Sequence, residues 1–310
     1  MSFSPLKNGL SHIAAALLSL LSRLPFAFHY AASTCIIYPV LRYIVRYRLK
    51  VVRRNLHAAF PERSEAELRR IEHDFYRHLA DLIVETVKAH TLNRRSIREH
   101  MEWRGLDVVQ QAIDEGHDFV CAYLSHFGNW EWCVGLPLQR PEIGLCQIYH
   151  PLRNKVFDQW FQRSRSRFTA VNIPMKDTLR RLLRLRRQMQ EASLLGTDDA
   201  TPLRGMVLGN IADQVPRAEN IHLRLPFLHQ PTAVFTGAER LAAKMNMAFV
   251  YAHIARDRRG HYTVTFEPLL PHPDDASQDF PITRAYFRRL EADIQAQPHL
   301  WLWTHNRWKR

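Results

Sequence analysis

DFVCAYLSHFGNWE, residues 118–131, is the most informative stretch of the chain. Its first half, 118–124, is a short apolar run of strand length, and a polar turn follows at once. His126 is therefore expected to emerge where a buried strand ends. Gly128 permits an unusual backbone turn, and Asn129 is a favoured residue at a helix N-terminus. The stretch predicts a strand, a tight turn and a helix, with a histidine in the turn.

Similar apolar runs recur along the chain and alternate with segments of helical periodicity. The expected strands are 118–124, 143–149, 206–211, 248–254 and 262–266. The expected helices are 65–90, 106–115, 129–138, 156–168, 178–190, 234–246 and 283–296. This alternation predicts an α/β fold with a mixed, mostly parallel sheet flanked by helices. Ligands of such sheets bind beyond the carboxyl ends of the strands, where His126 is expected.

The charge of the chain is concentrated in a few zones. The 310 residues are 46% hydrophobic, and the mean hydropathy of −0.31 argues against a multi-pass membrane protein. The formal net charge is +13. Residues 1–60 hold eight basic and no acidic residues, and residues 150–190 hold eleven basic and two acidic residues. A short basic tail adds Arg307, Lys309 and Arg310. Such zones favour an anionic partner.

Residues 1–60 are expected to attach the chain to a membrane, followed by a single α/β domain at 61–310. Residues 24–41 carry no charge, but the run is short for a span of about 20 residues and contains Pro25, His29 and Pro39. A kinked span, an interfacial helix, a cleaved signal peptide and a buried helix pair all fit the apolar residues. The basic cluster at 42–54 favours an uncleaved anchor on the cytoplasmic leaflet.

His126 and Glu131 suggest acid–base chemistry. Glu131, in the first turn of the expected helix, is placed to accept a hydrogen bond from the imidazole, which would fix the tautomer and raise the basicity of the other ring nitrogen. His126 would then serve as a general base for a hydroxyl proton. The alternative is a capped helix with a solvated histidine and a glutamate favoured by the helix dipole. Spacing alone does not choose between them.

Other chemistries have weaker support in the sequence. The cysteines at 35, 121, 133 and 146 form no CxxC pair, so unpaired thiols in a reducing compartment are expected. No ligand spacing matches a zinc pattern. Neither GxGxxG nor GxxxxGKS occurs, so no nucleotide cofactor is expected.

HFGNWE fits the H-x4-[D/E] motif of glycerolipid-type acyltransferases, and segments along the whole chain match one branch of them. These segments are 47–48, 55–56, 60–62, 75–77, Glu85, 151–158, 163–167, 211–214, 235–237 and 301–308. The chain thus resembles the lipid A biosynthesis acyltransferases of the lauroyl/myristoyl type. The resemblance implies transfer of a fatty acyl chain from acyl carrier protein to a hydroxyl of a lipid A precursor, at the cytoplasmic face of the inner membrane. No cofactor is implied, because the thioester is a co-substrate.

The resemblance also implies roles for individual residues. His126 and Glu131 correspond to the catalytic dyad, and Arg165 and Asp213 correspond to residues that line the site. The candidate substrate-binding residues are Arg165, Asp213, Asn129, Arg153 and Arg167. Relatives usually have Tyr-Arg-Pro where this chain has Tyr149-His150-Pro151, so His150, Arg153 or neither takes the place of that arginine.

Two other functions stay open at this point. An acyltransferase could use another acceptor, such as lysophosphatidate. A non-catalytic peripheral protein that binds anionic lipid would explain the charge but not the histidine turn. Nucleic acid is not an expected partner, because no nucleic-acid module occurs. Direct attack without an acyl-enzyme is expected, because strand alternation directs Ser125 away from His126.

Overall fold

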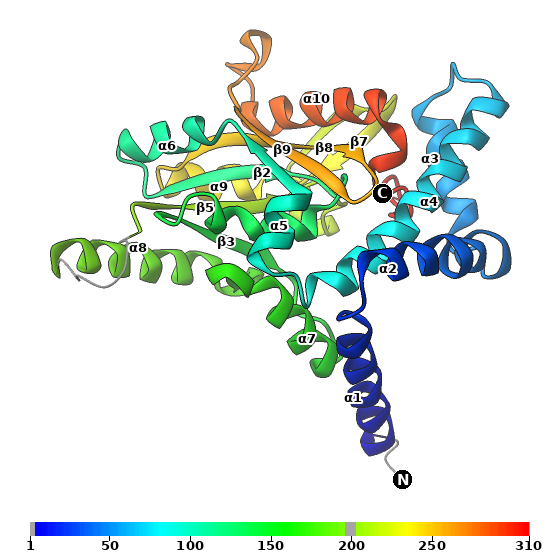
Figure 1. Ribbon diagram of the computed structural model, residues 1–310. Coiled ribbons are helices and arrows are strands. Elements are labelled where there is room, and N and C mark those ends of the chain that lie inside the picture. The colour runs from blue at the N-terminus through cyan, green and yellow to red at the C-terminus, as the bar shows by residue number, and fades with distance from the viewer. Residues whose placement is uncertain (1–3, 196–202, 310) are drawn as a thin grey trace.

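The computed structural model describes residues 4–195 and 203–309 (Figure 1). The strands are β1 Met101–Arg104, β2 Phe119–Leu124, β3 Ile143–Tyr149, β4 Val171–Pro174, β5 Gly205–Ile211, β6 Leu223–Phe227, β7 Gln230–Val234, β8 Ala248–Arg258 and β9 His261–Pro268. The α-helices are α1 Ser4–Leu21, α2 Phe26–Ala32, α3 Leu49–Ala59, α4 Glu65–Ala89, α5 Arg94–His100, α6 Leu106–Asp114, α7 Lys155–Arg165, α8 Thr178–Leu195, α9 Gly237–Lys244 and α10 Pro281–Ala296.

Shorter helical segments complete the chain. The π-helical segments are η1 Ser33–Ile37 and η2 Val40–Ile44. The 3-10 segments are η3 Trp130–Leu138, η4 Arg167–Thr169, η5 Met175–Asp177, η6 Ala218–Asn220, η7 Pro273–Asp275 and η8 Pro298–Leu300.

Seven strands form the main sheet in the order β1-β9-β8-β2-β5-β3-β4. Neighbouring strands are parallel except β8 and β9, which are antiparallel. Strand β2 lies at the centre and is buried along its whole length, which explains its continuous apolar sequence. The predicted fold class, a mostly parallel sheet flanked by helices, is confirmed. Strands β6 and β7 form a separate hairpin.

Hydrophobic side chains cover both faces of the sheet. Cys121 and Tyr123 of β2 belong to a cluster that includes residues of α4, α9 and α10. Ala122 and Leu124, on the opposite face, belong to a second cluster with residues of α6 and η3. The alternation along β2 therefore sends even-numbered residues towards η3, and this face leads to His126.

Several expected elements differ from the structure. Strands β1, β4, β6 and β7 were not expected, and the first two are four-residue strands at the edges of the sheet. The helix expected at 129–138 is the 3-10 segment η3, which contains Pro137. Proline has no backbone N–H to donate, and this disfavours a regular α-helix there. The expected helix at 234–246 is shorter, because Val234 ends β7 and α9 begins at Gly237.

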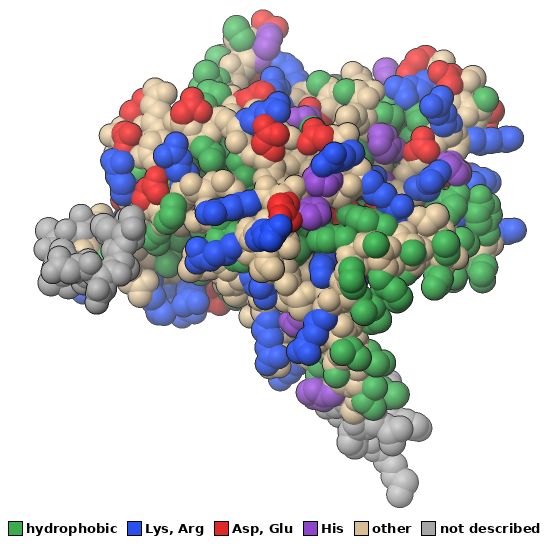
Figure 2. Space-filling model, in the orientation of Figure 1, with side chains coloured by type: hydrophobic (Ala, Val, Ile, Leu, Met, Phe, Trp, Pro, Cys, Tyr) green, Lys and Arg blue, Asp and Glu red, His purple; other side chains and the backbone are tan. Residues whose placement is uncertain are grey.

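The N-terminal arm, residues 4–45, comprises α1, α2, η1 and η2. Figure 1 shows α1 projecting away from the sheet. No helix of the described residues is long and apolar enough to span a membrane. The arm is fixed to α4 by Lys88, whose ammonium group donates to the carbonyls of Ser22 and Leu24 at 3.1 and 2.8 Å. Figure 2 shows hydrophobic side chains gathered at the surface along its lower right. The exposed large apolar side chains of the arm include Leu10, Ile13, Leu17, Leu20, Phe28, Ile36 and Ile44.

Candidate active site

The register of two central parallel strands brings His126 beside Asp213. Leu124 of β2 pairs with Ile211 of β5, and each polar residue follows two positions later. The Nδ1 atom of His126 lies 2.7 Å from Oδ1 of Asp213. The backbone N–H of His126 donates to Oδ2 at 3.0 Å. Two adjacent strand ends thus place an imidazole and a carboxylate together, as expected at the carboxyl edge of such a sheet.

Asp213 is enclosed and ionised. Its side chain is 3% exposed, and the indole N–H of Trp301 donates to its Oδ2 at 2.9 Å. Burial alone would raise the pKa of Asp213, but the charge of His126 and the hydrogen bonds from His126 and Trp301 lower it overall. A carboxylate accepts hydrogen bonds only, so Nδ1 of His126 carries a proton, and in the neutral imidazole the lone pair is then on Nε2.

The carboxylate partner of His126 differs from the expectation. The sequence places Glu131 against the imidazole, whereas the structure has Asp213 in that position. The physical reason is that adjacent strand ends bring Asp213 within reach, while Glu131 is held elsewhere. Nε2 of His126 lies 3.3 Å from the amide nitrogen of Gln214, which can donate to it.

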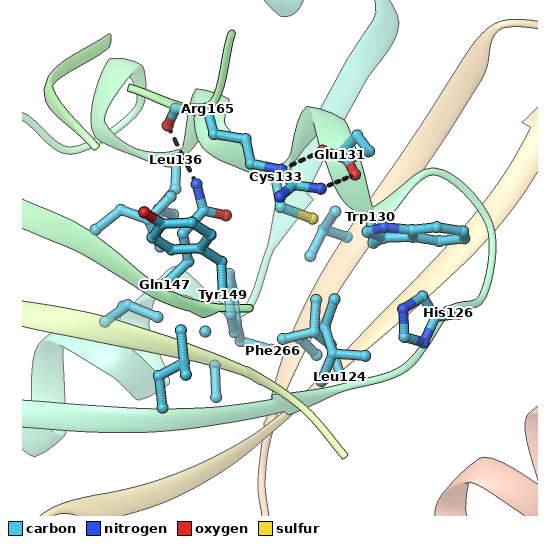
Figure 3. A pocket seen from close by; sticks show the side chains of 18 of the residues that line it. Leu124, His126, Trp130, Glu131, Cys133, Leu136, Gln147, Tyr149, Arg165 and Phe266 are labelled. Carbon is cyan, nitrogen blue, oxygen red and sulfur yellow. Dashed lines mark hydrogen bonds and ion pairs between the residues drawn. The ribbon is translucent and has the colours of Figure 1, made fainter. Parts of the chain in front are cut away.

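Glu131 forms a bidentate ion pair with Arg165. The Nε and Nη2 atoms of Arg165 donate to the two carboxylate oxygens at 2.9 and 2.6 Å. Glu131 lies in the first turn of η3 and Arg165 ends α7, so the pair joins these two elements. Both side chains are partly buried, at 12% and 28% exposure, which strengthens the pair relative to a surface contact. Figure 3 shows Trp130 between this pair and His126.

The backbone of the histidine turn is fixed by the C-terminal segment. The N–H of Leu302 donates to the carbonyl of His126 at 3.0 Å, and the N–H of Gly128 donates to the carbonyl of Leu300 at 3.1 Å. Gly128 has a φ of +61°, and a Cβ there would lie 2.8 Å from Cγ2 of Ile254. Glycine is therefore required at this position by both conformation and space.

A cavity of about 420 Å³ extends from His126 along the face of the sheet that packs against η3. Its polar lining residues include His126, Glu131, Arg165 and Gln214 (Figure 3). Further in, the lining is mostly apolar and includes Ala122, Leu124, Leu136, Leu145, Val207, Ala252, Val264 and Phe266. A cavity with catalytic-type groups at one side and hydrocarbon walls suits a substrate with a long apolar part.

A model of the bacterial lipid A biosynthesis acyltransferase family matches residues 1–310. The chain belongs to this family. Membership implies an acyltransferase of lipid A biosynthesis, and it confirms the family indicated by the resemblance in the sequence. The comparison with curated proteins gave no match.

The acyltransferase places the other candidate residues in different surroundings. Arg153 is exposed on the loop between β3 and α7, next to Leu152 of the cavity lining. His150 lines the cavity mouth. Arg167 lies elsewhere, since its guanidinium donates to the backbone carbonyls of His90 and Leu92. Its contacts are structural, so the structure does not bring it into the cavity with Arg165.

Asn129 is also a structural residue of the acyltransferase. Its side chain is fully buried and accepts from the N–H of Trp132 at 3.3 Å, as predicted for a helix cap. Its amide donates to Glu85 at 2.8 Å. The Glu85 carboxylate, 1% exposed, also accepts from Tyr262 at 2.7 Å and from Tyr30 of the arm at 3.0 Å. Asn129 therefore holds the turn in place. Its complete burial gives no support to the expectation that it contacts substrate.

Sequence reasoning missed several residues that shape the site. Trp301 holds Asp213, Gln214 faces His126, and Glu85 anchors Asn129. All three lie in segments that resemble the family, but the resemblance assigned no role to any of them. The four cysteines are unpaired, as expected. Among the described residues, no group of three or more His, Cys, Asp or Glu side chains is arranged to hold a metal ion.

Proposed function

We propose that the chain transfers a fatty acyl group from acyl carrier protein to a hydroxyl of a lipid A precursor, with His126 as general base. The observation that carries this proposal is the buried Asp213–His126 pair at the mouth of a largely apolar cavity. The family supplies the acceptor class. The charge zones and the cavity support a carrier-bound fatty acyl donor.

The proposed reaction is a direct acyl transfer. The acceptor hydroxyl displaces the Gln214 amide from Nε2 of His126 and gives its proton to that nitrogen as its oxygen attacks the thioester carbon. The tetrahedral oxyanion then collapses, the C–S bond breaks, and the imidazolium returns the proton to the leaving thiolate. Asp213 keeps Nδ1 protonated and stabilises the imidazolium. General base catalysis contributes a factor of about 10²–10⁴ to the rate.

Arg165 has a separate role in the proposal. Its guanidinium is oriented by both oxygens of Glu131 and lines the cavity, where it can stabilise the oxyanion or bind an acceptor phosphate. Glu131 is then a positioning residue for Arg165. Ser125 is buried and absent from the cavity lining, in keeping with a mechanism without an acyl-enzyme. A trapped radiolabelled acyl-enzyme would overturn the direct mechanism.

We further propose that the N-terminal arm lies in the interface of the inner membrane on its cytoplasmic side. Large apolar side chains of the arm are exposed, with Leu10 at 63% and Ile44 at 74%, and exposed Arg23 and Arg46 lie among them. This combination is typical of interfacial helices that bind anionic lipid. Replacing Leu10, Ile13 and Leu17 with Ser should release the protein from membrane fractions, whereas retention would contradict the assignment.

The carrier protein is expected to dock beside the cavity mouth. Arg153, Lys155 and Arg163 are exposed on the β3–α7 loop and on α7. An acidic carrier would be attracted to them. Replacing Arg153 and Lys155 with Glu should raise KM for the carrier thioester by about tenfold, which corresponds to 1.4 kcal/mol. The same replacements of Arg240 and Lys244, exposed on α9, provide the matched control.

The acceptor is tested by mass spectrometry of total lipid A from cells with and without the gene. A shift by one acyl chain supports the proposal. Unchanged lipid A with altered phospholipids supports an acceptor such as lysophosphatidate. A His126→Ala protein that is folded and membrane-bound should transfer no acyl chain. Full activity in that variant would refute the site, and an inert wild-type protein that binds anionic vesicles would favour the non-catalytic function.

A further inference from the structure

The apolar end of the cavity has a definite boundary at Trp103. Trp103 of β1 lines the active-site cavity and also lines a second cavity, of about 700 Å³, on its other side. The second cavity is bordered by charged side chains that include Arg98, Glu102 and Asp257. Trp103 thus borders both an apolar part of the first cavity and the charged lining of the second.

The path from the histidine turn to Trp103 crosses four adjacent strands. The cavity is lined by Leu124 on β2, Ala252 on β8, Phe266 on β9 and Trp103 on β1. Ala252 pairs directly with Phe266, and Trp103 pairs with Val264, which also lines the cavity. All cavity residues contributed by β8, β9 and β1 are apolar. On β3 the lining mixes apolar Leu145 with polar Gln147 and Tyr149, so the side formed by β8, β9 and β1 is the one that carries no polar lining residue. An acyl chain whose thioester carbon lies at His126 is therefore expected to run towards β1.

Trp103 is held in place by packing. Its ring stacks on Phe266 with centroids 6.2 Å apart and planes 14° apart. Its indole nitrogen is buried and has no hydrogen-bond partner among the described residues. The stacked ring of Trp103 therefore fills space at this end of the cavity.

We propose that Trp103 sets the longest acyl chain that the cavity accepts. This inference rests on the proposed function. Three strand spacings of about 4.8 Å separate β2 from β1, a span of roughly 14 Å. With C–C bonds of about 1.52 Å and angles near 111°, each methylene of an extended chain advances about 1.25 Å. The span therefore accommodates a chain of about a dozen carbons, and a longer chain would meet the indole.

The test is a competition among carrier thioesters of 10, 12 and 16 carbons, with the products quantified by mass spectrometry. Trp103→Ala opens the cavity into the groove, so the ratio of 16-carbon to 12-carbon product should rise about 10-fold or more, the scale of methylene discrimination. Trp103→Phe keeps a ring over Phe266 and is the matched control, with a smaller change. Ala252→Leu narrows the same path and should raise the ratio of 10-carbon to 12-carbon product.

The outcomes separate this inference from the function on which it rests. An unchanged 16-to-12 ratio in folded Trp103→Ala, with the wild-type enzyme active, overturns the inference alone. If Trp103→Ala does not fold, Ala252→Leu decides, and an unchanged 10-to-12 ratio in it overturns the inference. A wild-type protein that transfers none of the three chains refutes the proposed function, and this inference with it.

Discussion

Replacing Asp213 with Asn tests which carboxylate orients His126, the proposed general base. Oδ2 of Asp213 accepts from the backbone N–H of His126 and from the indole of Trp301, at 3.0 and 2.9 Å. An asparagine keeps these two bonds only with its oxygen in the Oδ2 position. Its NH₂ group then occupies the Oδ1 position, 2.7 Å from Nδ1 of His126, and can only donate. The imidazole must therefore adopt the other tautomer, with the proton on Nε2.

The expected loss follows from this change of tautomer. Nε2 would no longer accept the hydroxyl proton, so the contribution of general base catalysis, about 10²–10⁴ in kcat, should be lost. The same substitution in a serine protease triad costs about 10⁴, by the same loss of the correct tautomer. Glu131→Gln leaves the Asp213–His126 pair intact. We expect it to lower kcat through Arg165 while the tautomer of His126 stays unchanged, with the proton on Nδ1.

The assay is the initial rate of acyl transfer from carrier thioester to a lipid A precursor, measured for wild type and both variants, with the tautomer of His126 read from its ring nitrogens by nitrogen NMR. Asp213→Asn should carry the proton on Nε2, and Glu131→Gln should keep it on Nδ1. The reasoning is refuted if Asp213→Asn keeps the proton on Nδ1 and retains more than about one hundredth of the rate. A change of tautomer in Glu131→Gln alone would restore Glu131 as the partner of His126.

Three further predictions concern stability. Gly128→Ala places a Cβ against Ile254 in a residue with positive φ, and it should lower the free energy of unfolding by about 1–3 kcal/mol. Denaturant unfolding measures this loss, and an unchanged stability would contradict the strain. Ser64→Ala removes the hydroxyl that accepts from the N–H of Glu67 but keeps the backbone N–H that donates to the Glu67 carboxylate; it should cost about 1 kcal/mol, and a loss below the error of the measurement would show that tertiary contacts fix α4. Burial lowers the pKa of His305 to about 4, and its Nε2 accepts from the N–H of Val215. The unfolded state, with a pKa near 6.5, takes up the proton first, so stability should fall as pH drops from about 6.5 to 4. His305→Gln should flatten the decline of Tm over this interval, and an unaltered slope would assign the decline to other groups.

The central strands could be predicted from the sequence because a strand that is buried on both faces has a continuous apolar run. The expected 118–124 and 143–149 match β2 and β3 to within one residue. Edge strands have a weaker sequence pattern, since in β1 the exposed Glu102 and Arg104 alternate with the more buried Met101 and Trp103. The expected start of the helix at 65 is confirmed, and a capping box between Ser64 and Glu67, a local hydrogen-bonding pattern, lies there.

The partners of the site residues are non-local, and sequence spacing alone did not give them. His126 and Asp213 are 87 positions apart, and only the β2–β5 register brings them together. Glu131 is five positions from His126, which suggested a direct contact. Its partner is Arg165, 34 positions away, because α7 lies above η3. The histidine could therefore be located from the sequence, while the group that orients it required the topology of the sheet.

Several of the basic residues counted in the charge zones have partners within the fold. Of the eight basic residues before position 61, Arg42 and Arg53 pair with Glu72, which is 2% exposed. Arg48 and Arg54 donate to Thr304 and Asn306 near the C-terminus. Arg307, counted in the basic tail, is 1% exposed, and burial lowers its pKa to about 10; Arg310 lies outside the described residues. The expected basic tail is therefore wrong for Arg307. Salt screens the attraction between surface charges over about 8–10 Å, but it does not screen the burial of apolar side chains. Attachment of the arm to a membrane should therefore depend more on its exposed apolar side chains than the net charge of +13 suggests.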